Sequence, residues 1–153
     1  MARREMGQAD IERLITGRDL ESVTGAEANG APLLEKAHRT IATAAGISAD
    51  DPYSSYVLAY DAARAACTAL LAQQGLRPTT KGGHIAVEQA VRSQFGPGFR
   101  AFGALRRRRN ELEYPHLPED TASLDEATEA VGSSQRLIAA AHQLLPRLSF
   151  FRQ

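Results

Sequence analysis

The longest unbroken helical pattern in the sequence runs from Tyr53 to Gln74, and it limits the folds that the chain can adopt. Apolar residues recur there at the three- and four-residue spacing of one helix face, and a second apolar row, rich in alanine, lies beside the first. So wide an apolar face predicts a central helix with neighbours on both sides. Asp50-Asp51-Pro52 in front of it is typical of a helix start, with an aspartate as cap and proline at the first helical position.

Other segments show the same helical period. We expect helices over Gln8 to Thr16, from Pro32 to a stop at Gly46, from His84 to Phe95, from about Phe99 to Glu113, and from a capping-box serine at Ser123 to Leu145, with Leu124 on its core face. No segment alternates with period two. The sequence therefore predicts an all-α fold, an antiparallel bundle of four to five helices. Residues 1–31 would form a short helix and loop and residues 32–153 the bundle, in one domain overall.

Two glycine-containing segments read as loops. Residues 17–30 are mostly small, polar or acidic, and the piece from Arg18 to Val23 is left undecided between turn and regular structure. Residues 75–83 contain Lys81 beside two glycines, which raises the alternative of a phosphate-binding loop. The segment lacks the spacing of a P-loop and follows a helix instead of a strand, so we interpret it as a plain flexible connector.

Charge and cysteine content exclude several classes of protein. Lys+Arg and Asp+Glu both number 18, so no global field attracts nucleic acid or an anionic membrane, and any phosphate affinity must be local. The single cysteine, Cys67, sits among alanines and is expected to be a buried small hydrophobe. Neither a signal peptide nor a membrane-spanning run is apparent, which predicts a soluble, cytoplasmic protein without membrane contact.

The chain's local basic patch is Arg106-Arg107-Arg108-Arg109. It is followed directly by Asn110 and Glu111, and then by Tyr114 and His116. On a helix, Arg109 shares a stripe with apolar Phe102, Leu105 and Leu112. A guanidinium on an apolar stripe must be paired or hydrogen-bonded, because stripping its water otherwise costs several kcal/mol. Arg107 and Arg108 fall on the opposite side, where water can solvate them.

The remaining chemistry is limited. The four histidines are isolated in the sequence, so we expect no metal site, and no nucleophile motif or dinucleotide fingerprint suggests a cofactor. Arg109, Asn110, Tyr114 and His116 remain as catalytic candidates. An arginine fork suits a phosphate oxygen, and a histidine can move protons near neutral pH. Together they could cleave RNA without metal, the base taking the proton of a 2′-hydroxyl that attacks the adjacent phosphate.

The stretch Arg109-Asn110-Glu111-Leu112-Glu113-Tyr114, before a final long helix, resembles the signature of HEPN domains: an arginine, a polar residue and a histidine after four to six intervening residues. The long Tyr- and Ala-rich helix, the Gly-Leu-Arg-Pro loop and the histidine at His84 are also similar, most of all to an actinobacterial branch of the family. By this resemblance Arg109 takes the motif arginine and Asn110 the polar residue. Tyr114 stands at the usual histidine position, and His116 at the longest permitted spacing.

The resemblance implies a small all-helical homodimer without cofactor. It implies a toxin or defence-system component that acts on RNA, as a metal-independent endoribonuclease with a dimeric cleft centred on Arg109. The alternative is a non-catalytic HEPN module that binds a partner protein, such as a nucleotidyltransferase antitoxin, or a nucleotide or phosphate ligand.

Each candidate residue also has a structural interpretation. Arg109 could be bonded to Glu113 one turn on, or to a carboxylate such as Asp61. Arg106, Arg107 and Arg108 could contact RNA phosphate or form a solvated helix face, which zero net charge favours. His84 would be a helix-start residue or a contact at the edge of the core.

Overall fold

The structure is a computed structural model that describes residues 6–152. Its elements in chain order are α2 (Gln8–Thr16), β1 (Leu20–Ser22), η1 (Gly25–Glu27), α3 (Ala31–Ile47), α4 (Pro52–Gln73), β2 (Leu76–Pro78), α5 (Gly83–Phe95), η2 (Gly96–Phe99), α6 (Arg100–Glu113), α7 (Leu124–Leu144) and η3 (Leu145–Arg147). The chain is predominantly helical, which confirms the all-α bundle.

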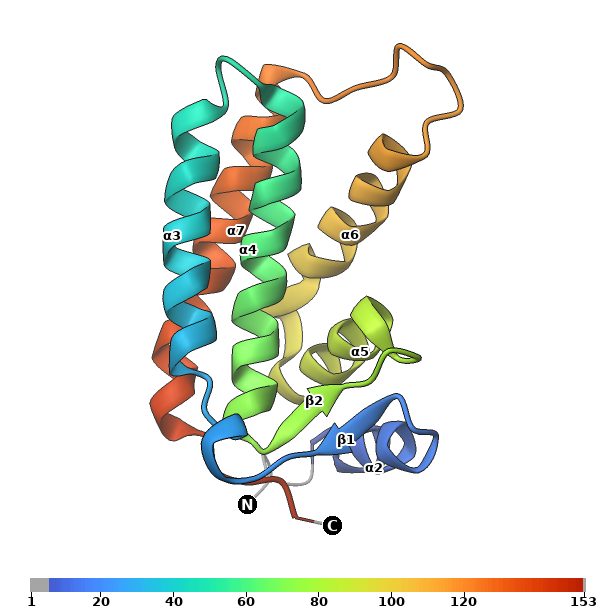
Figure 1. The fold of residues 1–153 in the computed structure, drawn as a ribbon, viewed down its shortest axis with the longest axis vertical. Coiled ribbons are helices and arrows are strands. Elements are labelled where there is room, and N and C mark those ends of the chain that lie inside the picture. Colours follow the sequence, from blue (N-terminus) through green and yellow to red (C-terminus); the bar gives the residue numbers. More distant parts are fainter. Residues whose placement is uncertain (1–5, 153) are drawn as a thin grey trace.

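Three long helices, α3, α4 and α7, pack along one another and make up the bundle (Figure 1). α3 runs antiparallel to both α4 and α7. The latter two run in the same direction, because α6 carries the chain back to the upper end before α7 begins. α6 leans away from α4 towards its C-terminal end, and α5 and α2 lie across the lower half of the molecule. The central helix expected from the sequence is α4, which contacts α3, α5, α6 and α7.

The helix ends follow the sequence signals closely. The Asp51 side chain accepts a hydrogen bond from the Ser54 backbone amide at 3.1 Å, with Pro52 as the first helical residue. Ser123 caps α7 by accepting from the Glu126 amide at 3.1 Å. Gly75, after α4, has a φ of 75°, a left-handed conformation that ends a helix without strain in glycine. α3 runs one residue past the expected stop at Gly46.

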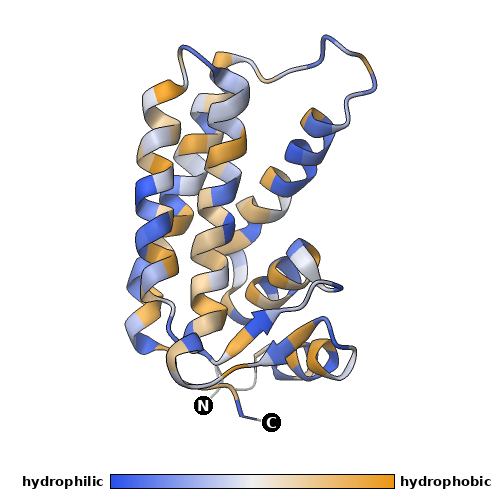
Figure 2. Cartoon of the chain, in the orientation of Figure 1, coloured by the Kyte–Doolittle hydropathy of each residue, from blue (hydrophilic) through white to orange (hydrophobic). Residues whose placement is uncertain are grey.

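The core lies along α4 and gathers the inward faces of its neighbours, as the hydropathy colouring shows (Figure 2). Tyr60 and Phe102 are its largest fully buried side chains, and their rings stack with centroids 5.7 Å apart. Cys67 is buried as expected, and burial raises the pKa of its thiol. Leu124 was wrongly expected on the core face of α7. It is 48% exposed, because it is the first residue of that helix.

A two-stranded antiparallel sheet joins the two segments that were expected to be loops. Leu20 pairs with Pro78 and Ser22 with Leu76, so the undecided piece after Arg18 contains a strand. The interpretation of residues 75–83 as a plain connector was therefore incomplete. Three-residue strands are too short to show an alternating pattern, and their pairing is long-range, so the sequence does not reveal them.

The loop after β2 is held against the N-terminal segment. The Thr79 amide donates to the Asp19 carbonyl at 3.0 Å, and Lys81 Nζ donates to the Gly17 carbonyl at 2.7 Å. Gly82 lies so close to this segment that a Cβ on it would be 2.1 Å from the Asp19 carbonyl oxygen. These contacts fix the start of α5, and with it His84. No helix among residues 6–152 is long and apolar enough to cross a membrane.

Candidate functional site

Arg109 lies where the helical pattern places it, on the buried side of α6. Its side chain is 26% exposed, and its Nη1 donates to the Glu113 carboxylate one turn on. The guanidinium carbon is 5.8 Å from the centroid of the Tyr60 ring, a cation–π distance. Arg109 Nε is buried without a hydrogen-bond partner. The guanidinium is thus only partly satisfied by the protein.

The other three arginines of the stretch differ from one another. Arg106 Nε donates to Glu88 of α5 at 2.7 Å, and its side chain is only 19% exposed. Arg107 is 62% exposed and lies 3.8 Å from the same carboxylate. A solvated helix face therefore describes Arg107 alone. A role of Arg106 and Arg107 in binding RNA phosphate stays a prediction.

Arg108 joins α6 to the following loop and to α7. It pairs with Glu126 at 2.9 Å, with Glu111 at 3.2 Å and with Asp120 at 3.3 Å. Its hydrogen bonds to Asp120 and Glu126 raise the pKa of the guanidinium above its usual value. This arginine has its carboxylates within the protein, so a phosphate would have to compete with them.

The structure does not bring the remaining motif residues to Arg109. The Asn110 side chain is exposed, Tyr114 is 74% exposed, and His116 is exposed on the loop between α6 and α7. Within the described chain, no hydrogen bond or ion pair joins any of these three side chains to Arg109. Their catalytic roles stay predictions.

A different histidine lies beside the arginine stripe. His84, in the first turn of α5, makes a hydrogen bond through Nδ1 with the Tyr60 hydroxyl, and its Nε2 is 2.5 Å from Nη1 of Arg64. Tyr60 and Arg64 are one turn apart on α4. The Tyr60 ring lies beside the imidazole, with centroids 5.6 Å apart, and also beside the Arg109 guanidinium. We call the side chains of Tyr60, Arg64, His84 and Arg109 the His84 cluster.

The contact with Arg64 fixes the protonation state of His84. A guanidinium carries only donors, so His84 Nε2 must accept its hydrogen bond and bears no proton. The proton of the neutral ring is then on Nδ1, which donates to the oxygen of the Tyr60 hydroxyl. Burial, followed by the charges of Arg64 and Arg109, lowers the pKa of His84 below its usual value, while Asp61 opposes this shift. Both arguments give a neutral imidazole at pH 7.

Tyr60 is the donor that this arrangement leaves without an acceptor. Because its oxygen receives the His84 proton, its own O–H must donate elsewhere, and no other hydrogen bond of this hydroxyl is formed within residues 6–152. The side chain is fully buried, and burial raises the pKa of the phenol to about 12. The hydroxyl therefore stays protonated, and stays a donor, throughout the physiological range.

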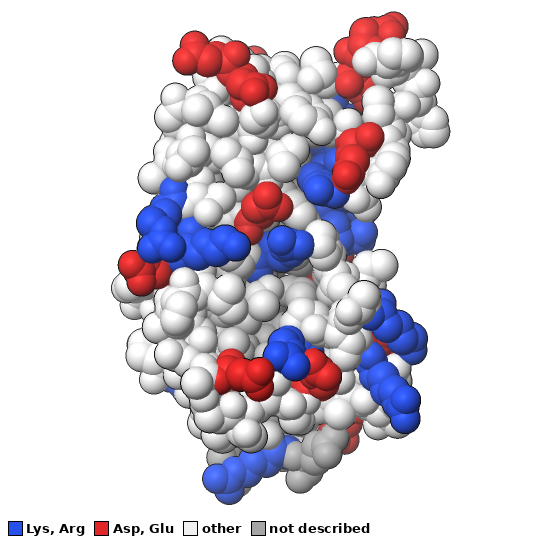
Figure 3. All heavy atoms as spheres, in the orientation of Figure 1, with Lys and Arg blue, Asp and Glu red and all other residues white. Residues whose placement is uncertain are grey.

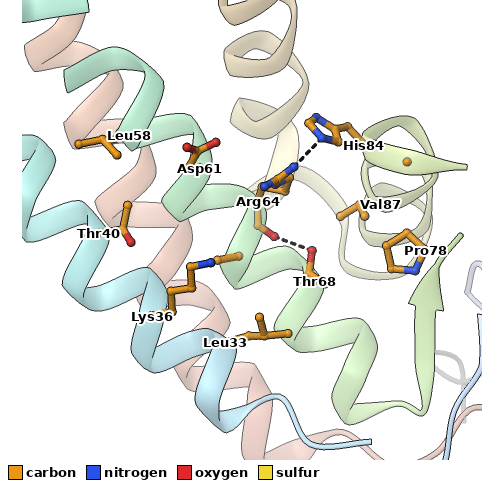
Figure 4. Close-up of a pocket in the computed structure, with 12 residues that line it drawn as sticks. Leu33, Lys36, Thr40, Leu58, Asp61, Arg64, Thr68, Pro78, His84 and Val87 are labelled. Atoms are coloured by element: carbon orange, nitrogen blue, oxygen red, sulfur yellow. Dashed lines mark hydrogen bonds between the residues drawn. The ribbon is translucent and has the colours of Figure 1, made fainter. Parts of the chain in front are cut away.

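A cavity of about 470 Å³ opens on the Arg64 side of the cluster (Figure 4). Lys36 and Thr40 line it from α3, Asp61, Arg64 and Thr68 from α4, and His84 from α5, with apolar side chains between them. Lys36 extends from α3 towards α4 in this view. Neither Lys36 nor Arg64 forms an ion pair with any carboxylate of the described chain. On the surface, basic side chains form an interrupted band across the middle of the face in Figure 3.

Residues 6–152 contain no group of three or more His, Cys, Asp or Glu side chains placed to hold one metal ion. In the comparisons with known proteins, no family model, curated protein or solved structure matches the chain.

Sequence reasoning singled out Arg109 but missed Arg64 and the contacts of His84 with Tyr60 and Arg64. The signal for Arg64 was present, because it lies on the same apolar stripe of α4 as Tyr60 and Cys67 and thus breaks an apolar pattern as Arg109 does on α6. His84 carries no such signal, since its position depends on the packing of α5 across α4. Lys36 lies at the exposed edge of α3 and reads as an ordinary surface lysine.

Proposed function

We propose that the protein acts on RNA as a HEPN-type toxin or defence component, and that the His84 cluster binds an RNA phosphate. A homodimer and an antitoxin partner belong to the same proposal, on the strength of the resemblance. In this proposal the site is centred on the His84 cluster, whose residues come from α4, α5 and α6, instead of on the motif of α6 alone.

The observation that carries this proposal is an excess of hydrogen-bond donors. Within residues 6–152, Arg64 makes one hydrogen bond to His84 and no ion pair, Arg109 Nε is buried without a partner, and the Tyr60 hydroxyl has no acceptor for its proton. Buried or half-buried donors without acceptors are costly, at about 1–3 kcal/mol each. A ligand that brings several acceptor oxygens and negative charge removes this cost, and a phosphodiester is such a ligand.

The neutral imidazole supplies the base for metal-independent cleavage. When Arg64 turns its N–H groups to the phosphate, the lone pair on His84 Nε2 becomes free to take the proton of a ribose 2′-hydroxyl. The 2′-oxygen then bonds to phosphorus, the bond to the 5′-oxygen breaks, and that oxygen takes a proton from a water molecule, whose hydroxide is neutralised by the proton on His84. The products are a 2′,3′-cyclic phosphate and a 5′-hydroxyl. Arg64 and Arg109 would stabilise the charge that builds on the phosphate oxygens.

One observation favours the second candidate, an RNA- or phosphate-binding module without cleavage. In this structure Arg64 occupies the only lone pair of His84, and the histidine of the motif, His116, lies exposed on a loop. Such a module would bind through the same donors and leave RNA intact. The two candidates share the site and differ only in whether a base reaches the 2′-hydroxyl.

Both candidates are tested with fluorescently labelled RNA in the presence of EDTA, read once as anisotropy and once on a denaturing gel. We expect Arg64→Ala and Arg109→Ala to weaken binding by roughly ten- to a hundredfold, the value of a charged hydrogen bond. Arg136→Ala, an exposed arginine on α7, is the matched control and keeps wild-type affinity.

On the denaturing gel, variants of the two histidines distinguish the nuclease from the binding module. Cleavage that is lost in His84→Gln and kept in His116→Ala supports the nuclease with His84 as base. Cleavage lost only in His116→Ala assigns the base to the motif histidine instead. RNA that is bound but intact supports the binding module. RNA that is not bound at micromolar protein contradicts the proposal as a whole.

A further inference from the structure

The cavity beside Arg64 has a composition that the binding of an internal phosphodiester does not explain. Its basic side chains come from three helices: the cations Lys36 from α3 and Arg64 from α4, and the neutral imidazole of His84 from α5. Arg109 is not among its lining residues, so Arg64 and His84 are shared between the wall of the cavity and the contacts with Tyr60 and Arg109. The cavity therefore adds a third fixed cation, Lys36, to Arg64 and Arg109 of the His84 cluster.

The walls of the cavity combine charge with apolar surface. Leu33, Leu58, Pro78 and Val87 line it together with the polar groups, and Thr40 adds a hydroxyl. Pockets of 300–1,000 Å³ with an apolar lining and a few polar groups bind small organic ligands, and about 470 Å³ is in this range. Such a volume accommodates one nucleotide and not a length of chain. The apolar wall suits a base, and the cations suit a phosphate.

The number of cations distinguishes between kinds of phosphate. A phosphodiester carries one negative charge, whereas a phosphate monoester carries between one and a half and two near pH 7 and has three acceptor oxygens. Lys36 and Arg64 supply two fixed positive charges without a carboxylate partner in the described chain, and protonation of His84 would supply a third. Asp61 on the wall opposes the ligand charge. Its oxygens can accept hydrogen bonds from ribose hydroxyls.

We propose that this cavity binds a nucleotide through a terminal phosphate monoester, with Lys36 and Arg64 as its anion ligands. This inference rests on the proposed function, because it makes an RNA that ends in phosphate the preferred ligand. The same chemistry is present in a free nucleoside monophosphate. The two sources differ in whether the rest of an RNA chain adds affinity across the His84 cluster.

The experiment compares four ligands with the full-length protein by isothermal titration calorimetry. They are one oligoribonucleotide with hydroxyl ends, the same oligoribonucleotide with a 5′-phosphate, the same with a 3′-phosphate, and a free nucleoside monophosphate. We expect one phosphorylated oligonucleotide to bind at least about tenfold more tightly than the hydroxyl form, as two charged hydrogen bonds would give. Lys36→Ala abolishes that preference and leaves the affinity for the hydroxyl form unchanged.

Arg39→Ala is the matched control, since Arg39 is a cation on the same helix as Lys36, pairs with Glu35 and does not line the cavity. It keeps the preference. Equal affinity for all three oligonucleotides overturns the inference and leaves the proposed function standing. Binding of the free monophosphate alone, lost in Lys36→Ala, keeps the cavity as a nucleotide site but contradicts the proposed action on RNA. A preference that survives Lys36→Ala also overturns the inference.

Discussion

His84 Nε2 lies 2.5 Å from Nη1 of Arg64, so the imidazole accepts a hydrogen bond from a residue that can only donate. This contact makes the ring neutral, places its proton on the nitrogen that faces Tyr60, and turns the tyrosine into a donor. His84, at the start of α5, thus contacts both Tyr60 and Arg64 of α4. The Tyr60 hydroxyl is left as a donor without an acceptor among the described residues.

The first prediction concerns the pH dependence of folding. Because the pKa of His84 is lowered in the folded protein, the unfolded chain binds more protons as pH falls through about 6.5, the usual value for histidine. The free energy of unfolding should therefore decrease as pH falls from 7 through this range, until the folded-state pKa is reached. His84→Gln should reduce this slope relative to the wild type. Urea unfolding of the two proteins at several pH values measures the slope, and equal slopes would contradict this prediction.

An anion bound at the His84 cluster should oppose the effect of the nearby arginines on the pKa of His84. Arg64, Arg109 and Arg106 disfavour its protonated form and Asp61 favours it. Bound sulfate, which stays a dianion throughout the range, would compensate the arginines and raise the pKa of His84. Sulfate affinity should therefore increase as pH falls from 7.5 to 6 in the wild type and stay level in His84→Gln. Thermal shift against sulfate concentration measures both, and a parallel pH response in the two proteins would rule the coupling out.

The substitution Tyr60→Phe tests the contribution of the Tyr60 hydroxyl separately from that of its ring. Tyr60→Phe keeps the stack on Phe102 and the contact with Arg109 but removes the acceptor of the half-buried His84 Nδ1–H. We expect a loss of about 1–2 kcal/mol in the free energy of unfolding. The matched change Tyr53→Phe is on the same helix at a side chain that is 38% exposed, and should cost less than about 0.5 kcal/mol. Chemical denaturation of the pair provides the measurement, and similar losses would show that the hydrogen bond contributes nothing particular.

Much of the fold was predictable, because it depends on local signals. The cap at Asp51, the glycine stop at Gly75 and the helical period of α6 act within a few residues, and each is found where the sequence places it. The strands β1 and β2 were not predictable, since their three residues each pair across more than fifty positions of the chain. Arg109 was found because a charge interrupts an apolar stripe.

The rest of the site depends on how helices cross. His84 meets Tyr60 and Arg64 only because α5 packs over α4, and no periodicity within α5 records this. The ion pairs that Arg106 and Arg108 form with other segments were not predictable for the same reason. Their carboxylate partners lie on α5, on α7 and in the loop before α7. Sequence patterns identify which residues of a helix face inward, whereas their partners are set by tertiary packing.

The close approach at Gly82 tests whether the N-terminal segment positions His84. Gly82→Ala would place a Cβ 2.1 Å from a backbone oxygen that cannot move without disturbing β1. We expect a loss of about 1–3 kcal/mol in stability, as for other overpacked sites, together with weaker RNA binding. Gly46→Ala in α3 has open space around the new Cβ and should instead stabilise by about 0.5–1 kcal/mol. Thermal unfolding of both variants measures the two changes in stability. A Gly82→Ala variant as stable as the wild type would contradict this prediction.

The central claim, that an RNA phosphate binds at the His84 cluster, is tested most directly by the imidazole nitrogen signals of the protein in solution. His38, His116 and His142 serve as internal references, and His84→Gln assigns the signal of His84. On titration with RNA, we expect the Nε2 signal of His84 to shift as Arg64 leaves it, while the signals of His38 and His142 stay in place. A titration in which His84 does not move, or in which only His116 responds, would contradict it.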